Sequence, residues 1–129
     1  MKNFSTFVRK ISGTTTDRKY RFLADLYHTE EISDRALERL TKRIDRNAFF
    51  TNPTIICLSE LDGDELDIIK YRKISSFSYS DEISVVGIAR DEDDALEVIS
   101  LIASDIYKKT GGCSMKTYFT DHALWQSFS

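Results

Sequence analysis

The stretch ISVVGIARDEDDALEVISLIASDIYKK, residues 83–109, decides the fold of this chain. Its first part, 83–90, is an apolar run of the length and composition typical of a buried β-strand. The second part predicts a helix over 91–109, because four acidic residues open it, two lysines close it and a glycine pair follows. Nine of the residues from 95 to 107 are apolar, so we expect this helix to lie across the sheet as the main core element.

Two further strands are expected before this stretch. The segments TIICLSE (54–60) and ELDIIKYRKI (65–74) are strand-like, and Asp62-Gly63 between them is a strong hairpin signal. A tight turn of this kind requires a positive φ at both central positions, which Asp and Gly tolerate. The pattern therefore predicts an antiparallel hairpin with a two-residue turn.

The C-terminal residues predict one more strand and a turn. The segment MKTYF (115–119) is short and strand-like, and Asp121 can cap a final turn that presents Trp125. Trp125 either docks on its own domain, as we expect, or contacts a partner, because Trp and Tyr are prominent in binding hot spots. Tyr79, in ISSFSYSDE, is an interface candidate for the same reason.

In the N-terminal part of the chain the apolar residues recur with helical spacing. They predict helices over 3–13, 16–28 and 33–47, and Ser33 is the expected N-cap of the last. We therefore expect an α+β fold, in which an N-terminal three-helix, helix-turn-helix-like segment packs with a small, mainly antiparallel sheet and one long covering helix. Three helices followed by strand, Asp-Gly turn and strand is also the element order of a winged helix-turn-helix domain.

The 129 residues predict a single domain (1–129) with a formal net charge of −3, but the charge is divided unevenly along it. Residues 1–52, the basic helical half, hold 11 Lys and Arg against 7 Asp and Glu. Residues 53–129, the acidic β-β-β-α-β half, hold 7 against 14. The change falls at Pro53, the single proline, and we expect Phe49-Phe50 to seal the join between the halves.

Composition excludes several classes of protein. The chain is 41% hydrophobic and 12% aromatic, which argues against disorder, and no apolar run approaches the roughly 18 residues of a membrane span. Arg9 and Lys10 lie where a signal peptide would have its apolar stretch. Cys57 and Cys113 are too few for a disulfide scaffold and lack metal-ligand spacing. We expect a cytoplasmic protein with no membrane contact, no metal and no cofactor.

The helix predicted over 33–47 has the sharpest functional signal, which is a stripe of cations opposite its apolar residues. This basic face consists of Arg35, Arg39, Lys42, Arg43 and Arg46. Solvated helix faces usually alternate in sign, because opposite charges four residues apart stabilise a helix by roughly 0.2–0.5 kcal/mol and like charges cost about as much. This helix has three like pairs at that spacing, and only Glu31–Arg35 and Glu38–Lys42 favour it. The pattern therefore predicts contact with an anionic surface.

Signals for catalysis or metal binding are weaker. The acidic residues within 62–67 lack the spacing of a calcium loop and fit a hairpin turn better. The acidic run 91–94 fits helix capping. His28 and His122 have no local partner motif, so the sequence favours a protein that is not an enzyme.

These observations lead to two hypotheses. In the first, the chain is a small non-enzymatic regulatory or inhibitory protein that binds a protein partner of mixed surface charge, for example in the transcription machinery, through the basic face and the acidic second half. In the alternative, it is a winged-helix-like regulator that binds nucleic acid with the helix over 33–47. The residues expected to contact nucleic acid are then Arg18, Lys19, Arg21, Arg39, Arg43 and Arg46. The acidic hairpin disfavours this alternative, because phosphates repel carboxylates.

Overall fold

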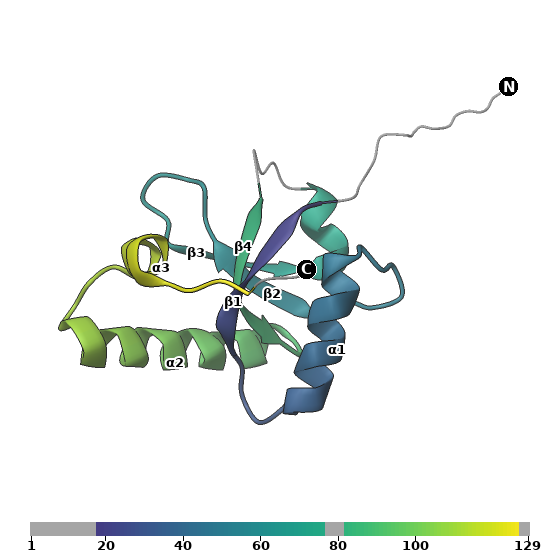
Figure 1. Ribbon diagram of the computed structural model, residues 1–129, viewed down its shortest axis with the longest axis horizontal. Helices are drawn as coiled ribbons and strands as arrows, with labels where there is room; N and C mark the ends of the chain where they lie inside the picture. Colours follow the sequence, from purple (N-terminus) through teal and green to yellow (C-terminus); the bar gives the residue numbers. More distant parts are fainter. Residues whose placement is uncertain (1–17, 77–81, 127–129) are drawn as a thin grey trace, which may run out of the picture.

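The computed structural model describes residues 18–76 and 82–126. Within these ranges the chain has an α+β fold with a four-stranded mixed sheet and three α-helices (Figure 1). The strands are β1 (Tyr20–Tyr27), β2 (Thr54–Leu58), β3 (Leu66–Lys70) and β4 (Ile83–Ala89). The helices are α1 (Asp34–Asp45), α2 (Glu92–Thr110) and α3 (Met115–His122), with a 3-10 helix, η1 (Tyr71–Ser76), after β3. None of the helices in these ranges is long and apolar enough to span a bilayer.

Strand β4 lies inside the sheet, whose strand order is β1-β4-β2-β3. It runs parallel to β1 and antiparallel to β2. All seven of its residues are buried, so both faces of the sheet are covered at this strand. Helices α2 and α3 lie on one side of the sheet, and α1 and η1 lie on the other (Figure 1). The strand expected over 83–90 is confirmed, and it is the centre of the core.

Helix α2 confirms the helix expected over 91–109. Asp91 is its N-cap, and the carboxylate accepts a hydrogen bond from the backbone N–H of Asp94 at 2.9 Å. Gly111 ends the helix with a φ of +79°, a left-handed conformation that glycine adopts without strain. The apolar residues of the inner face that are buried against the sheet are Ala95, Val98, Ile102 and Ile106.

The hairpin between β2 and β3 is confirmed, but its turn is wider than expected. The strands pair in register from Thr54 opposite Lys70 to Leu58 opposite Leu66. Gly63 has a φ of +89°, and among the described residues of the loop it alone has a positive φ. The loop is closed by a hydrogen bond of 3.1 Å from the Ser59 N–H to the carbonyl of Glu65, so the tight two-residue turn is wrong.

Residues 20–27 form strand β1, so the helix expected over 16–28 is wrong. Phe22 lies opposite Val85 and Tyr27 lies opposite Gly87, which means that β1 has extra residues between two pairs that are close on β4. This bulge interrupts the alternation of a strand and gives the buried residues a spacing like that of a helical face. Tertiary pairing with β4 decides the conformation, and the aromatic residues of β1 suit a strand.

The N-terminal three-helix segment is therefore wrong as well. Helix α1 is preceded by a strand, and the helix expected over 3–13 lies outside the described residues. The chain does not form the helix-turn-helix arrangement of a winged-helix domain in the part that the structure describes. The sheet is also mixed rather than mainly antiparallel, because β1 is parallel to β4.

Residues 115–119 belong to helix α3, so the last strand expected there is wrong. Ser114 caps this helix through a hydrogen bond of 3.1 Å from the Thr117 N–H, and Asp121 lies within it rather than at its start. The chain then becomes extended, and Trp125 pairs with Leu23 at the outer edge of β1. The composition of residues 115–119 favours a strand, but Ser114 caps a helix there and the segment is helical.

Gly87 allows α2 to approach the sheet, which leads to a prediction. A Cβ at this position would lie 3.0 Å from Val98 Cγ1 and 3.1 Å from the carbonyl oxygen of Tyr27, which is backbone and yields little. We expect Gly87→Ala to lower the free energy of unfolding by about 1–3 kcal/mol in urea titrations. Gly87→Ala with Val98→Ala should lose less than the sum of the two single changes. Unchanged stability of Gly87→Ala would contradict this packing.

Candidate functional site

Helix α1, which holds the basic face, confirms the helix expected over 33–47. The hydroxyl of Ser33 accepts a hydrogen bond from the Ala36 N–H at 3.2 Å and so caps the N-terminus. The inner face packs against the core: Thr41 and Ile44 are buried, and Leu37 and Leu40 are partly buried. The cations are therefore on the face that points away from the sheet.

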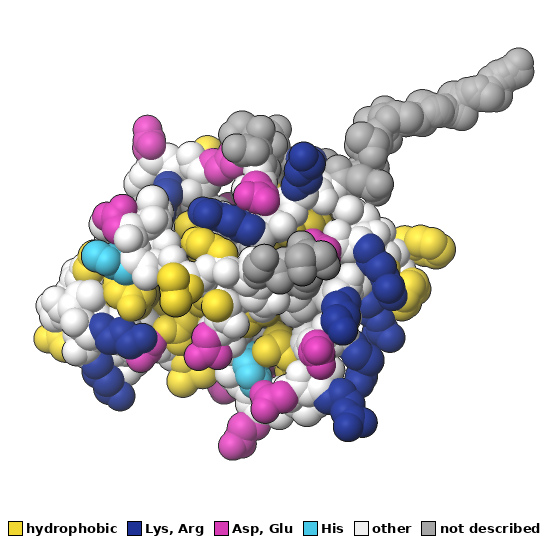
Figure 2. Space-filling view, in the orientation of Figure 1, with side chains coloured by type: hydrophobic (Ala, Val, Ile, Leu, Met, Phe, Trp, Pro, Cys, Tyr) yellow, Lys and Arg dark blue, Asp and Glu magenta, His cyan; other side chains and the backbone are white. Residues whose placement is uncertain are grey.

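Four of the five cations of the basic face are exposed, and Arg43 is half-buried. Figure 2 shows Lys and Arg side chains gathered in a column along one edge of the molecule, where α1 lies in Figure 1. Lys42 pairs with Glu38 at 3.7 Å, and the guanidinium of Arg43 lies 5.1 Å from the ring centre of Phe50. The side chains of Arg35, Arg39 and Arg46 form no ion pair with any described residue. The structure thus places the predicted cations together on one open surface.

The charge of the basic face is less compensated than the sequence suggested. The carboxylate of Glu31 pairs with Arg90 at 3.0 Å, in place of the expected pair with Arg35. Each like pair at a spacing of four residues costs roughly 0.2–0.5 kcal/mol. The three like pairs are therefore unfavourable for the helix, whereas Lys42 and Arg43 in its last turn suit the helix dipole.

The other described site residues predicted from the sequence lie outside helix α1: Arg18, Lys19, Arg21 and Trp125. Arg21 donates a hydrogen bond of 2.7 Å to the hydroxyl of Ser84, and its guanidinium lies 4.0 Å from the ring centre of Trp125. Arg21 and Trp125 thus contact residues of this chain, in agreement with the expectation that Trp125 docks internally. The backbone of Arg18 pairs with the side chain of Asn47, and Lys19 is exposed just before β1. Tyr79 lies outside the described residues.

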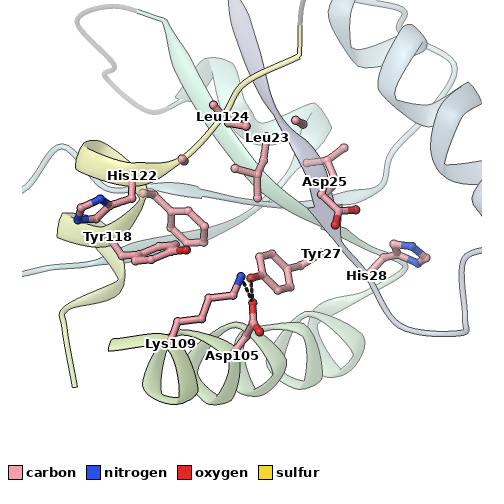
Figure 3. A pocket seen from close by; sticks show the side chains of 13 residues that line it. Leu23, Asp25, Tyr27, His28, Asp105, Lys109, Tyr118, His122 and Leu124 are labelled. Carbon is pink, nitrogen blue, oxygen red and sulfur yellow. Dashed lines mark hydrogen bonds and ion pairs between the residues drawn. The ribbon is translucent and has the colours of Figure 1, made fainter. Parts of the chain in front are cut away.

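A polar pocket lies between β1, α2 and α3, on the side of the sheet opposite to α1 (Figure 3). It has a volume of about 420 Å³. The hydroxyl of Tyr27 donates a hydrogen bond to Oδ2 of Asp105, and the Nζ of Lys109 lies 3.1 Å from the same oxygen. His28 and His122 also line the pocket but lie on opposite sides of it (Figure 3). The sequence does not reveal this group, because the spacing of apolar residues around Tyr27 predicts a helix.

The electrostatics of this pocket stabilise the charges that are already there. Burial and the hydrogen bond to Asp105 raise the pKa of the Tyr27 hydroxyl far above its ordinary value of 10.0. The hydrogen bonds from Tyr27 and Lys109 lower the pKa of Asp105 below its ordinary value of 3.8. Tyr27 is thus a hydrogen-bond donor rather than a base, and the Asp105 carboxylate is occupied by two donors. The three side chains connect β1 to α2.

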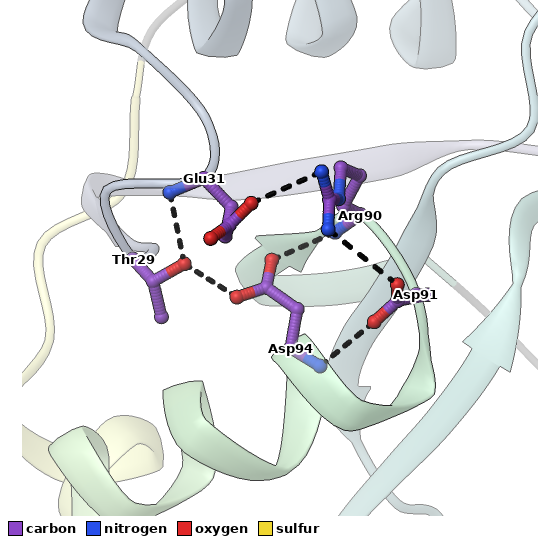
Figure 4. Close-up of polar contacts among 5 residues, drawn as sticks. All are labelled: Thr29, Glu31, Arg90, Asp91 and Asp94. Carbon is purple, nitrogen blue, oxygen red and sulfur yellow. Dashed lines mark hydrogen bonds and ion pairs between the residues drawn. The ribbon is translucent and has the colours of Figure 1, made fainter.

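A second polar cluster joins the loop after β1 to the start of α2 (Figure 4). The hydroxyl of Thr29 donates to one carboxylate oxygen of the buried Asp94, and the other oxygen accepts from the Arg90 N–H at 2.9 Å. Thr29 accepts in turn from the Glu31 N–H at 3.2 Å. Both oxygens of Asp94 are therefore used, and the cluster fixes the loop that leads into α1.

The acidic hairpin loop and the two cysteines have structural contacts in the described part of the chain. The described residues contain no group of three or more His, Cys, Asp or Glu side chains placed to hold a metal ion. In the hairpin loop, Glu65 accepts a hydrogen bond from the Lys116 N–H at 3.3 Å. Cys57 is a buried core residue and Cys113 is half-buried, and both are free thiols.

The hydrogen bond between Tyr27 and Asp105 can be tested through the pKa of the carboxylate. We expect Tyr27→Phe to raise the pKa of Asp105 toward 3.8, because the first cause of its lowering is removed. Since a carboxylate with a lowered pKa stabilises the fold above its unfolded pKa, wild type should lose more stability on acidification than Tyr27→Phe. Carboxyl-carbon NMR during a pH titration measures the pKa directly. Tyr107→Phe, at an exposed position on α2, is the control; an Asp105 pKa that is the same in Tyr27→Phe and wild type would contradict the geometry.

Comparisons of the chain with family models, with curated proteins and with solved structures give no match. The residues of the basic face and of the polar pocket are therefore the basis for a functional assignment.

Proposed function

We propose that this protein is a small, non-enzymatic regulatory or inhibitory protein, and that its basic face binds a partner protein through an acidic surface. The observation that supports the proposal is a row of five cations along one side of α1, of which four are exposed and three form no ion pair with any described residue. A helix face of one sign costs stability, so it requires a reason other than folding.

The type of cation favours a protein surface as the ligand. Four of the five cations are arginines, whose planar guanidinium pairs with carboxylates, as with phosphates, in a bidentate manner. Arginine is enriched in protein interfaces, whereas lysine is depleted there. A row of carboxylates on the partner would compensate the basic face and fix its register on α1.

The acidic second half suits a partner of mixed charge. The loop between β2 and β3 carries the exposed residues Glu60, Asp62 and Asp64, and it lies away from α1 in Figure 1. Proteins that handle nucleic acid, including those of transcription, combine acidic and basic surfaces and form one class of partner. The free thiols of Cys57 and Cys113 suit the reducing cytoplasm, where we place the protein.

Nucleic acid itself is a less suitable ligand for this surface. The hypothesis depended on a second helix that would hold Arg18, Lys19 and Arg21 beside the basic face, and these residues precede or belong to strand β1. Arg21 is used within the domain, on Ser84 and Trp125. Of these three residues, Arg21 is therefore not available for a phosphate contact.

Charge reversal on the basic face tests the proposal. The full-length protein, carrying an affinity tag, is isolated from the cells that produce it, and the bound proteins are quantified by mass spectrometry. We expect Arg39→Glu with Arg46→Glu to reduce the recovery of the main partner by about tenfold or more, because both cations are exposed and form no ion pair with a described residue.

The matched control is Lys108→Glu with Lys116→Glu, on α2 and α3. It produces the same change in net charge, from −3 to −7, at a distance from α1. This variant should recover the partner as wild type does. Equal recovery by wild type and the Arg39→Glu, Arg46→Glu variant would contradict the proposal, and so would a bound fraction that consists of nuclease-sensitive nucleic acid.

A further inference from the structure

The loop that follows α1 is held firmly at both of its ends. At the start, Asn47 has a φ of +58°, and its side chain accepts from the Arg18 N–H at 2.9 Å and donates to the Arg18 carbonyl at 3.0 Å. At the end, the side chain of Asn52 accepts from the Arg72 N–H at 3.0 Å. Ala48 and Thr51 are buried on the two sides of the loop tip. The tip is therefore fixed in its conformation before any partner arrives.

This fixed tip presents two phenylalanines to solvent. Phe49 is 85% exposed and Phe50 is 57% exposed. Their rings meet edge to face, with centres 6.3 Å apart. The expectation that this aromatic pair seals the join between the two halves of the chain is wrong, because the neighbours Ala48 and Thr51 are buried instead. Two adjacent exposed aromatic rings contribute little to the fold and need another explanation.

Two arginines lie beside the loop that holds the aromatic pair. The guanidinium of Arg43, in the last turn of α1, lies over the ring of Phe50. On η1, the Nε of Arg72 donates to the carbonyl of Thr51 at 3.3 Å, which brings a second guanidinium to the loop. Figure 2 shows exposed hydrophobic side chains at one end of the column of Lys and Arg. The basic face and the aromatic pair are thus parts of one surface.

We propose that the aromatic pair is the main contact of this surface, and that it enters an apolar pocket of the partner protein whose rim carries carboxylates. This inference rests on the proposed function. Binding energy in protein interfaces is concentrated in a few central residues with charged residues around them, and a fixed loop loses little entropy on binding. Arginines at the rim would meet the carboxylates as the rings are buried.

An anionic membrane and single-stranded nucleic acid can also receive exposed rings beside cations. A membrane surface attracts basic segments by charge, and a strand of nucleic acid stacks its bases on aromatic rings. The charge of the chain favours the protein, because its acidic remainder would be repelled by both phosphate-rich ligands. Both ligands are distinguishable outcomes of the test.

The test uses the full-length protein with the photoreactive residue p-benzoylphenylalanine at position 49, irradiated in the cells that produce it. The control carries the same residue in place of Tyr107, which is 66% exposed on α2. We expect the yield of one protein adduct from position 49 to exceed that from position 107 by about fivefold or more. Peptide mapping should place the adduct on a partner surface with apolar residues next to Asp or Glu.

A second variant, Phe49→Ser with Phe50→Ser, separates this inference from the proposed function. Both side chains are exposed, so the melting temperature should stay within about 2 °C of wild type. Recovery of the partner should fall by about tenfold or more. If recovery is retained here but lost in Arg39→Glu with Arg46→Glu, the aromatic contact is overturned and the proposed function stands; if both variants retain it, both proposals fail. Equal adduct yields at positions 49 and 107, no adduct, or an adduct with lipid, nucleic acid or a second copy of the chain also overturns the inference.

Discussion

The burial of β4 on both faces is the constraint on which the rest of the structure depends. All seven of its residues are buried, so each side of the sheet needs a cover. Gly87 lets α2 approach one side closely, since an added Cβ would lie 3.0 Å from Val98. Helix α1 and η1 lie on the other side (Figure 1). The position of α1 is therefore set by its buried residues, Thr41 and Ile44, and its outer surface remains available for another role.

The polar contacts of the fold leave three arginines of the basic face without an ion pair to any described residue. Glu31 could have paired with Arg35, but its carboxylate is held by Arg90, in the cluster that connects the loop after β1 to α2 (Figure 4). An exposed salt bridge adds little to the stability of the fold. The cations of the basic face, in contrast, repel one another and lower the stability of the helix. Since the aromatic pair after α1 is exposed as well, charge and apolar surface meet at one place that the fold does not need. A partner with carboxylates and an apolar pocket would satisfy both.

The sequence predicted those helices whose ends are set by capping residues close to them in the chain. The caps Asp91 and Ser33 and the apolar faces of α2 and α1 were sufficient for those helices. Strand β1 was not predictable in this way, because its bulge imitates helical spacing and its conformation depends on pairing with β4. The contact between Tyr27 and Asp105 spans 78 residues of sequence, which no local pattern reveals. The cations of the site were predicted from spacing alone, whereas the role of the aromatic pair required its exposure to be known.

The central claim is that the charge of α1 serves contact rather than folding, and the stability of Arg39→Glu tests it most directly. Arg39 lies four residues from both Arg35 and Arg43, so this change converts two repulsive pairs into attractive ones. Urea unfolding at low ionic strength should show a gain of about 0.5–1 kcal/mol over wild type, and high salt should reduce the gain. A loss of stability in Arg39→Glu at low salt would show that the fold itself needs this arginine, which would contradict the account.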